Sequence, residues 1–223
     1  MNKPKVSLLG YTQGLMKFVL SSPEQLLSVG KRICNTDETL MDIAINNTDK
    51  MAKRRNLQTI KDGHMGVLEH IQFIFLIEGV SRVMTHQLVR HRMASYLQMS
   101  QRVVPMSKLH FFIPPSIQGT EWEHVWLEEL EKLKEIYDKM DTERLPDGKR
   151  RFDRGDIRYI MPHGMETRVW MTINGRSLCH FLKERLINSH AQWEIKEVAR
   201  QMYEHAHNVC PDLIDIERSE TWE

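Results

Sequence analysis

The sequence lacks several features that mark other classes of protein. Its 223 residues include three cysteines, Cys34, Cys179 and Cys210, too few and too scattered for a disulfide framework or a cysteine zinc site. A membrane-spanning helix needs about eighteen consecutive apolar residues, and no stretch of the sequence approaches that length. The first ten residues lack the apolar core of a signal peptide. These absences predict a cytoplasmic protein with no membrane partner.

The sequence also lacks the patterns typical of nucleic-acid and dinucleotide binding. The formal net charge is +1, so no global field draws the chain to nucleic acid or to an acidic membrane. No Gly-x-Gly-x-x-Gly run occurs, which excludes a Rossmann-type dinucleotide site. We find no internal repeat and no low-complexity linker. The length suits one large domain, and we expect residues 1–223 to form it.

Hydrophobic periodicity predicts an α+β fold. Strands are expected over residues 6–11, 69–78 and 166–173, with Gly79 breaking the second. Helices are expected over residues 23–33, 36–46, 48–61, 81–91, 121–140, 150–159, 175–188 and 193–208. Along residues 121–140, apolar side chains repeat at intervals of four and three and predict a buried stripe of Trp126, Leu130, Leu133, Tyr137 and Met140.

Residues 87–102 concentrate positive charge next to small hydroxyl groups. Arg90, His91 and Arg92 come first, and Ser100 and Arg102 follow. A guanidinium group offers a rigid fork of donors that fits two phosphate or carboxylate oxygens. The stretch therefore favours an anion site over a random basic surface. Further candidate anion ligands are Arg158, Arg176 and Arg185.

Three sequence blocks, taken in order, resemble the flavin-dependent thymidylate synthases. The first contains Gly63-His64 and Glu69-His70. The second contains Arg90-His91-Arg92, Ser100 and Arg102. The third runs from Asn174 through Arg176, His180 and Arg185 to Glu194. The resemblance extends over residues 30–213.

This resemblance implies an antiparallel sheet with flanking helices, in a homotetramer with active sites at the subunit interfaces. It implies FAD as cofactor, and conversion of dUMP to dTMP with methylenetetrahydrofolate as carbon donor and NADPH as reductant. It assigns FAD contacts to His64, Glu69, Arg90, His91, Arg92, Asn174, Arg176 and His180. It assigns dUMP contacts to Gln87, Arg90, Gln98, Ser100, Gln101, Arg102, Arg158 and Arg185.

The chemistry of these side chains agrees with the implied roles. A nucleotide monophosphate needs hydroxyl, amide and guanidinium donors, which Ser100, Gln101 and Arg102 supply. Arg185 is the candidate for stabilising the charge that develops on uracil as its C5 attacks, and Ser100 is the second catalytic candidate. No base is evident beside Ser100, and no cysteine lies near the arginine blocks. We therefore expect no covalent protein nucleophile.

Leu97, Val103, Gly66 and Cys34 depart from the family pattern. Modification of another pyrimidine nucleotide by a related flavin and folate reaction is therefore the alternative function.

Two other classes of protein remain as rivals. A nucleic-acid binder would combine residues 90–92 with the basic runs 53–55 and 149–151, but the near-zero net charge disfavours it. A metal hydrolase would use His64, His70, His86 and His91. Because His86 and His91 lie five residues apart, they miss the one-turn spacing of a helical metal pair. No metal is expected.

Overall fold

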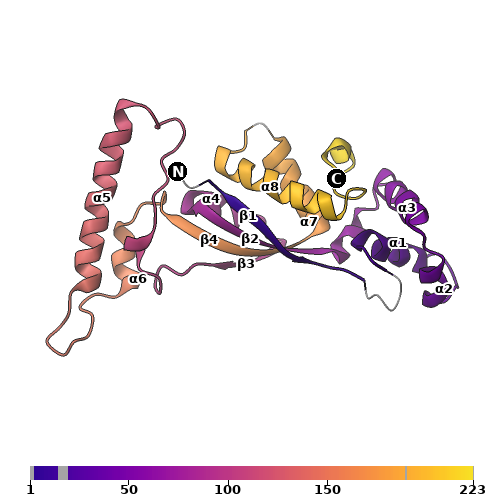
Figure 1. The fold of residues 1–223 in the computed structure, drawn as a ribbon, viewed down its shortest axis with the longest axis horizontal. Coiled ribbons are helices and arrows are strands. Elements are labelled where there is room, and N and C mark those ends of the chain that lie inside the picture. Colours follow the sequence, from indigo (N-terminus) through magenta and orange to yellow (C-terminus); the bar gives the residue numbers. More distant parts are fainter. Residues whose placement is uncertain (1–2, 15–19, 189, 223) are drawn as a thin grey trace.

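The computed structural model describes residues 3–14, 20–188 and 190–222. Its centre is a four-stranded antiparallel sheet in the order β1-β2-β4-β3 (Figure 1). The strands are β1 Lys5–Tyr11, β2 Gln72–Ser81, β3 Ala94–Gln98 and β4 Glu166–Asn174. The α-helices are α1 Pro23–Ile33, α2 Leu40–Ile45, α3 Asp49–Lys61, α4 Arg82–Leu88, α5 Glu121–Thr142, α6 Arg154–Ile157, α7 Gly175–Leu182 and α8 Trp193–Val209. Short 3₁₀ or π segments are η2 Met65–His70, η3 Met106–Lys108, η4 Arg158–Ile160, η5 Lys183–Ile187 and η6 Ile216–Thr221. The predicted α+β class and antiparallel sheet are confirmed.

One face of the sheet carries the main core. Phe73, Phe75 and Ile77 alternate along β2 and are fully buried, because every second side chain of a strand points to the same face. The register places Phe73 opposite Ile173 and Ile77 opposite Val169 on β4. Helices α4, α7 and α8 cover this face (Figure 1). The sheet and these helices together hold the residues from which the site is built.

The opposite face of the sheet carries an exposed apolar row. Leu76 on β2 pairs with Trp170 on β4, and Trp170 pairs with Leu97 on β3. Trp170 is 42% exposed and Leu97 is 73% exposed. Within the described ranges, no helix buries this row.

Strand β2 continues through Gly79, so the prediction that Gly79 ends the strand is wrong. The register shifts between Ile77 and Val80, which is a β-bulge, and Gly79 has a φ of +61°. A Cβ at Gly79 would lie 2.9 Å from the carbonyl oxygen of Lys3, so glycine is required there. The bulge carries the chain on to Ser81, where α4 begins.

Helix α5 lies away from the sheet (Figure 1). Leu130 and Tyr137 are buried, and Tyr137 belongs to a small second core with Met106 and Ile157. Trp126 is 40% exposed, so the predicted buried stripe is wrong at that position. The other two positions of the stripe, Leu133 and Met140, are partly buried. The exposed part of α5 is an apolar surface of this single chain.

Four helices are shorter than predicted. Helix α2 begins only at Leu40, where the Thr39 side chain caps it, and α4 ends at Leu88. Helix α6 begins only at Arg154, because the Asp153 side chain accepts a hydrogen bond from the Gly155 backbone N–H and caps the helix there. Helix α7 ends at Leu182, and the chain continues as the π-helical segment η5. No helix among the described residues is long and apolar enough to cross a membrane.

Candidate functional site

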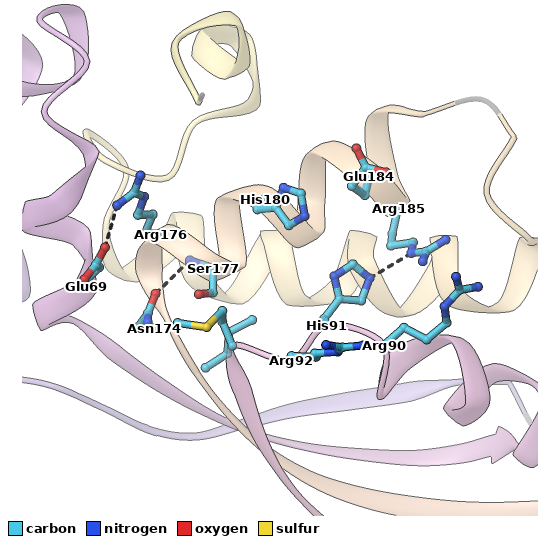
Figure 2. A pocket seen from close by; sticks show the side chains of 12 residues that line it. Glu69, Arg90, His91, Arg92, Asn174, Arg176, Ser177, His180, Glu184 and Arg185 are labelled. Atoms are coloured by element: carbon cyan, nitrogen blue, oxygen red, sulfur yellow. Dashed lines mark hydrogen bonds and ion pairs between the residues drawn. The ribbon is translucent and has the colours of Figure 1, made fainter.

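Most of the predicted cofactor residues surround one cavity of about 850 Å³, which lies between α7 and the connection from α4 to β3 (Figure 2). We call it the α7 cavity. Its lining residues are Glu69, Arg90, His91, Arg92, Met93, Ile173, Asn174, Arg176, Ser177, His180, Glu184 and Arg185. The structure thus brings together residues that are far apart in the sequence.

The connection after α4 directs the arginines into the cavity. Helix α4 begins at the N-cap Ser81 and ends at Leu88, so Arg90 and His91 lie in the turn after the helix. The Tyr96 hydroxyl donates to the His91 carbonyl oxygen at 2.7 Å and lies 3.0 Å from that of Leu88. Burial raises the pKa of Tyr96 to about 12, so the hydroxyl stays protonated and able to donate. This contact fixes the turn that carries Arg90 and His91.

His91 is a neutral support for Arg185. Burial, followed by the positive charge of Arg185 and the neighbouring His180 and Arg90, lowers the pKa of His91 to about 4. The neutral ring accepts a hydrogen bond at Nε2 from Arg185 Nε at 3.0 Å, and its edge packs on Phe181. The Nδ1 atom therefore carries the ring proton. The contact fixes the direction of Arg185 without reducing its charge.

The first turn of α7 contributes two further predicted residues. Asn174 is the N-cap, and its Oδ1 accepts from the Ser177 N–H at 2.8 Å. The Nδ2 group of Asn174 therefore remains able to donate to a ligand. Arg176 pairs with Glu69 at 2.7 Å, and both side chains are about half exposed. This pair joins α7 to η2 at one end of the cavity.

His64 lies apart from the other predicted cofactor residues. It lines a second, mostly apolar cavity of about 830 Å³ together with Cys34, Gly66 and His70. The segment η2 separates the two cavities, since Glu69 faces the α7 cavity while Gly66 and His70 face the second one. Within one chain, the predicted cofactor residues therefore lie around two separate cavities.

Two predicted dUMP residues, Arg102 and Arg158, lie with Arg82 at the other end of α4, and we call these three residues the arginine cluster. Arg82 donates to the Met99 carbonyl oxygen at 3.1 Å, and Arg158 Nε donates to that of Gly155 at 3.0 Å. Burial and the nearby charge of Arg158 lower the pKa of Arg82. A Cβ built on Gly155 would lie 3.6 Å from Arg102 Nε, which places Arg102 beside the same segment.

The arginine cluster has uncompensated charge. None of its three arginines forms an ion pair with a carboxylate in the part of the chain that the structure describes. The Nε atom of Arg82 is buried and has no hydrogen-bond partner there either. Such a group favours an anionic ligand, because a phosphate would supply the missing acceptors.

Four predicted dUMP residues remain. Gln87 lies within α4, and the other three differ in how many hydrogen bonds their side chains already make. Gln98 Nε2 donates to Thr85 Oγ1 at 3.0 Å, so this amide already holds β3 against α4. Gln101 makes only a long contact of 3.7 Å with the Met165 sulfur, and the Ser100 hydroxyl accepts from the Arg102 N–H at 3.3 Å. No basic side chain within the described ranges is hydrogen-bonded to the Ser100 hydroxyl.

The structure also bears on the two rival classes. His86 stacks on His163, His91 lies near His180, and His64 and His70 line the second cavity. Accordingly, no group of three or more possible metal ligands occurs among the described residues. The four histidines of the metal-hydrolase alternative therefore form no common site.

The two basic runs of the nucleic-acid alternative are largely matched by acids or amides. Lys53 pairs with Asp212 at 3.1 Å, and Arg55 donates to the Asn47 amide oxygen. The members of the second run pair with Asp147, Asp141 and Glu143. Neither run forms a continuous unpaired basic surface.

Comparison with known proteins now places the chain. Residues 15–212 match the family described as "Thymidylate synthase complementing protein". A flavin-dependent thymidylate synthase of Clostridium tetani is 32% identical over 219 residues, which cover 94% of this chain and 84% of the relative. The chain belongs to the flavin-dependent thymidylate synthase family. Enzymes of the same name from Pyrococcus furiosus and Saccharolobus solfataricus are 42% and 43% identical over 149 and 157 residues. These two matches cover 57% and 56% of the relatives' lengths.

Membership of the flavin-dependent thymidylate synthase family identifies the chain as an enzyme and confirms the predicted resemblance. The structure adds three residues that sequence reasoning missed. Arg82 completes the arginine cluster, Tyr96 fixes the turn after α4, and Glu184 adds a carboxylate to the α7 cavity. A signal existed for Arg82, because it is a cation at the first position of the helix that leads to Arg90. No sequence signal distinguishes Tyr96 or Glu184 from ordinary packing or surface residues.

Proposed function

We propose that the protein converts dUMP to dTMP, with methylenetetrahydrofolate as carbon donor and NADPH as reductant, and with FAD as cofactor. Family membership supports the reaction class. The observation that carries the proposal is the α7 cavity, where Arg90, Arg92 and Arg185 converge on one space of about 850 Å³. That set of donors suits a ligand that combines phosphate charge with a polar heterocycle.

The residues of the α7 cavity fit FAD. Arg90 and Arg92 offer donors for a pyrophosphate or for ring carbonyls, and Asn174 keeps its amide N–H groups available. The second cavity, with His64, extends the possible contact area. When FAD is bound, it supplies the redox chemistry, while the protein binds, orients and polarises.

The arginine cluster would bind the phosphate of dUMP. Arg82, Arg102 and Arg158 offer guanidinium donors, and none of them is ion-paired with an acid in the described part of the chain. The cluster lies at the start of α4, and Arg90 follows its end. Since a helix rises about 1.5 Å per residue, the two groups are on the order of 12 Å apart along the helix. The phosphate and the base would therefore contact different ends of α4.

Arg185 would act on the uracil ring. Neutral His91 holds its Nε, so the terminal N–H groups of Arg185 can face the ring carbonyls. Such donors stabilise the enolate-like charge that develops when C5 attacks the carbon donor. Arg185 is therefore the proposed catalytic residue, with Ser100 as a hydroxyl contact beside the nucleotide.

We expect the reaction to use no covalent protein nucleophile. Burial raises the pKa of the thiols of Cys179 and Cys210 well above the ordinary value, which disfavours a thiolate. Cys34 is exposed and lines the second cavity rather than the α7 cavity. The three free thiols also agree with the proposed cytoplasmic location.

A homotetramer with active sites between subunits is part of this proposal. The uncovered row of Leu76, Trp170 and Leu97 and the exposed Trp126 of α5 supply apolar surface for subunit contacts. The division of the predicted FAD residues between two cavities also suits a site completed by a second subunit. Light scattering should give a tetramer that loses flavin on dissociation, whereas an active monomer would contradict this assembly.

An activity assay with single omissions tests the proposed reaction. Purified protein should form dTMP from dUMP only when methylenetetrahydrofolate and NADPH are both added, and protein stripped of its flavin should do so only after FAD is restored. Replacement of dUMP by dCMP in the same assay tests the alternative pyrimidine. Product from dCMP but not from dUMP would overturn the proposed substrate.

A further inference from the structure

Glu184 is a carboxylate of the α7 cavity that the proposed reaction leaves without a role. Two carboxylates line this cavity, and Glu69 is paired with Arg176 at 2.7 Å. Glu184 is exposed and has no hydrogen-bond or ion-pair partner within residues 3–14, 20–188 and 190–222. An unpaired carboxylate disfavours anion binding in a cavity of arginines. Its presence therefore points to a ligand group that donates a hydrogen bond.

Glu184 has a possible hydrogen-bond donor before it and after it in the sequence, and both line the same cavity. His180 precedes Glu184 by four residues, so the two side chains lie one turn apart on the same side (Figure 2). Arg185 follows directly and extends toward His91. The chain is π-helical here, in η5, a distortion that often occurs at functional sites.

These three residues suit a specific chemical group. A histidine can donate from a ring nitrogen, a glutamate carboxylate only accepts, and arginine only donates. His180, Glu184 and Arg185 therefore offer two donors and one acceptor to a ligand in the same cavity. A ring imide presents the complement, which is a carbonyl, an N–H and a second carbonyl.

We propose that Glu184 accepts the ring N–H of an imide heterocycle, while His180 and Arg185 donate to the flanking carbonyl oxygens. The inference rests on the proposed function, because uracil and the flavin ring are the imides which that function brings to the cavity. Cytosine has an unprotonated nitrogen in place of the N–H, and a carboxylate repels its lone pair. Glu184 is thus a specificity-determining residue for an imide over its amino analogue.

Nucleotide titration of FAD-loaded protein tests this inference. Calorimetry with dUMP and with dCMP compares the wild type, Glu184→Leu and Glu184→Gln, while flavin occupancy and the visible spectrum are recorded for each. Glu220→Gln removes a negative charge from an exposed position outside the cavity and is the matched control.

If the imide is uracil, Glu184→Leu weakens dUMP binding at least about tenfold, since it removes a charge-assisted hydrogen bond. It strengthens dCMP binding, because it removes the carboxylate that repels the cytosine nitrogen. Glu184→Gln strengthens dCMP binding at least about tenfold, because the amide can donate to the cytosine nitrogen. If the imide is the flavin, both variants lower flavin occupancy or shift its absorption band, with an unchanged dUMP-to-dCMP ratio.

Either pattern supports imide recognition by Glu184. Variants that match the wild type and Glu220→Gln in both readouts would overturn it. A change confined to the KM for methylenetetrahydrofolate would overturn it too, because the pterin ring is not an imide. A wild-type protein that binds neither FAD nor dUMP contradicts the proposed function itself, and the imide inference fails with it.

Discussion

The α7 cavity and the arginine cluster both concentrate positive charge, but they hold their arginines differently. In the α7 cavity, side chains hold two of the four arginines: Arg185 donates to the neutral ring of His91, and Arg176 pairs with Glu69. The partner sets the direction of each of these two and, for Arg176, offsets its charge. Arg90 and Arg92 make no side-chain hydrogen bond or ion pair among the described residues. Individual positioning suits the polarisation of one ring atom.

In the arginine cluster, backbone carbonyl groups hold two of the three guanidinium groups. Arg82 donates to Met99 O and Arg158 donates to Gly155 O. A carbonyl oxygen orients a guanidinium without cancelling its charge, so the full positive charge remains for a ligand. We therefore propose that the chain separates two tasks: polarisation of a ring in the α7 cavity and neutralisation of a phosphate charge in the arginine cluster, at opposite ends of α4.

The largest expected effect comes from Arg185→Ala, which removes the positioned donor of the α7 cavity. The value of kcat for dTMP formation should fall about 100- to 1,000-fold, equivalent to ~2.7–4 kcal/mol of barrier, because the lost charge stabilisation grows in the transition state. Steady-state kinetics at saturating dUMP measure this effect. Arg200→Ala, at an arginine that pairs with Glu197 on the surface of α8, is the control. A defect in KM alone would show that Arg185 only binds substrate.

Arg158→Ala should affect the arginine cluster and leave the α7 cavity unchanged. Loss of one charge-assisted phosphate contact should raise the Kd for dUMP about 10- to 100-fold and leave flavin content unchanged. Arg82→Ala and Arg102→Ala should act in the same direction. Calorimetry and the flavin spectrum provide the two readouts.

The control for this prediction is Arg151→Ala, because Arg151 pairs with Glu143 at an exposed site. The separation of tasks would be wrong if Arg158→Ala released flavin while dUMP affinity stayed normal.

The pH dependence of the free energy of unfolding tests the α7 cavity, because His91 lines that cavity. The pKa of His91 lies at about 4 in the folded protein and near its ordinary value of 6.5 in the unfolded chain. Between these values the unfolded state binds a proton that the folded state does not, so stability falls as pH decreases from 6.5 toward 4. The His91 contribution is complete above pH 6.5. After allowance for partial exposure, it amounts to roughly 2 kcal/mol.

Denaturant unfolding of wild-type and His91→Gln apoprotein at several pH values measures this contribution. The variant should lose less stability between pH 7 and pH 4 than the wild type, because glutamine does not titrate. Equal losses in the two proteins would mean that His91 does not have a lowered pKa.

The smallest effect is expected from the cysteines, which belong to neither region. Replacement of Cys34, Cys179 and Cys210 by alanine should leave substantial turnover, with some loss of stability from the two buried positions. Kinetics and thermal unfolding check this expectation. A uracil adduct on any cysteine or serine, found by mass spectrometry of quenched reactions, would contradict a reaction without a covalent nucleophile.

Local patterns predicted much of the fold. Ser22, Thr48, Ser81 and Asn174 each cap a helix at the predicted place, because an N-cap depends on side chains within one turn. The strand that passes through Gly79 was harder to predict. A glycine at a bulge and a glycine after a strand have the same local sequence, and only the contact with Lys3 distinguishes them.

The sequence brought together several residues that line the α7 cavity, but it did not predict that the expected FAD residues lie around two cavities. Sequence blocks identified Arg90, Arg176 and Arg185, and the structure places all three around the α7 cavity. Sequence order did not reveal that His64 lies in a separate cavity, since that depends on how η2 packs against α1. Arg82 was missed because its significance comes from the nearby Arg158, which is distant in sequence.

One measurement tests the central claim, the separation of tasks between the two regions, most directly. Flavin occupancy and dUMP affinity should be measured on the same preparations of wild type, Arg92→Ala and Arg158→Ala. We expect the wild-type protein to be yellow and to release FAD on denaturation. Arg92→Ala should lose flavin, whereas Arg158→Ala should bind dUMP more weakly and keep its normal flavin content. A colourless wild-type protein that also fails to bind added FAD, or equal loss of both ligands in both variants, would contradict it.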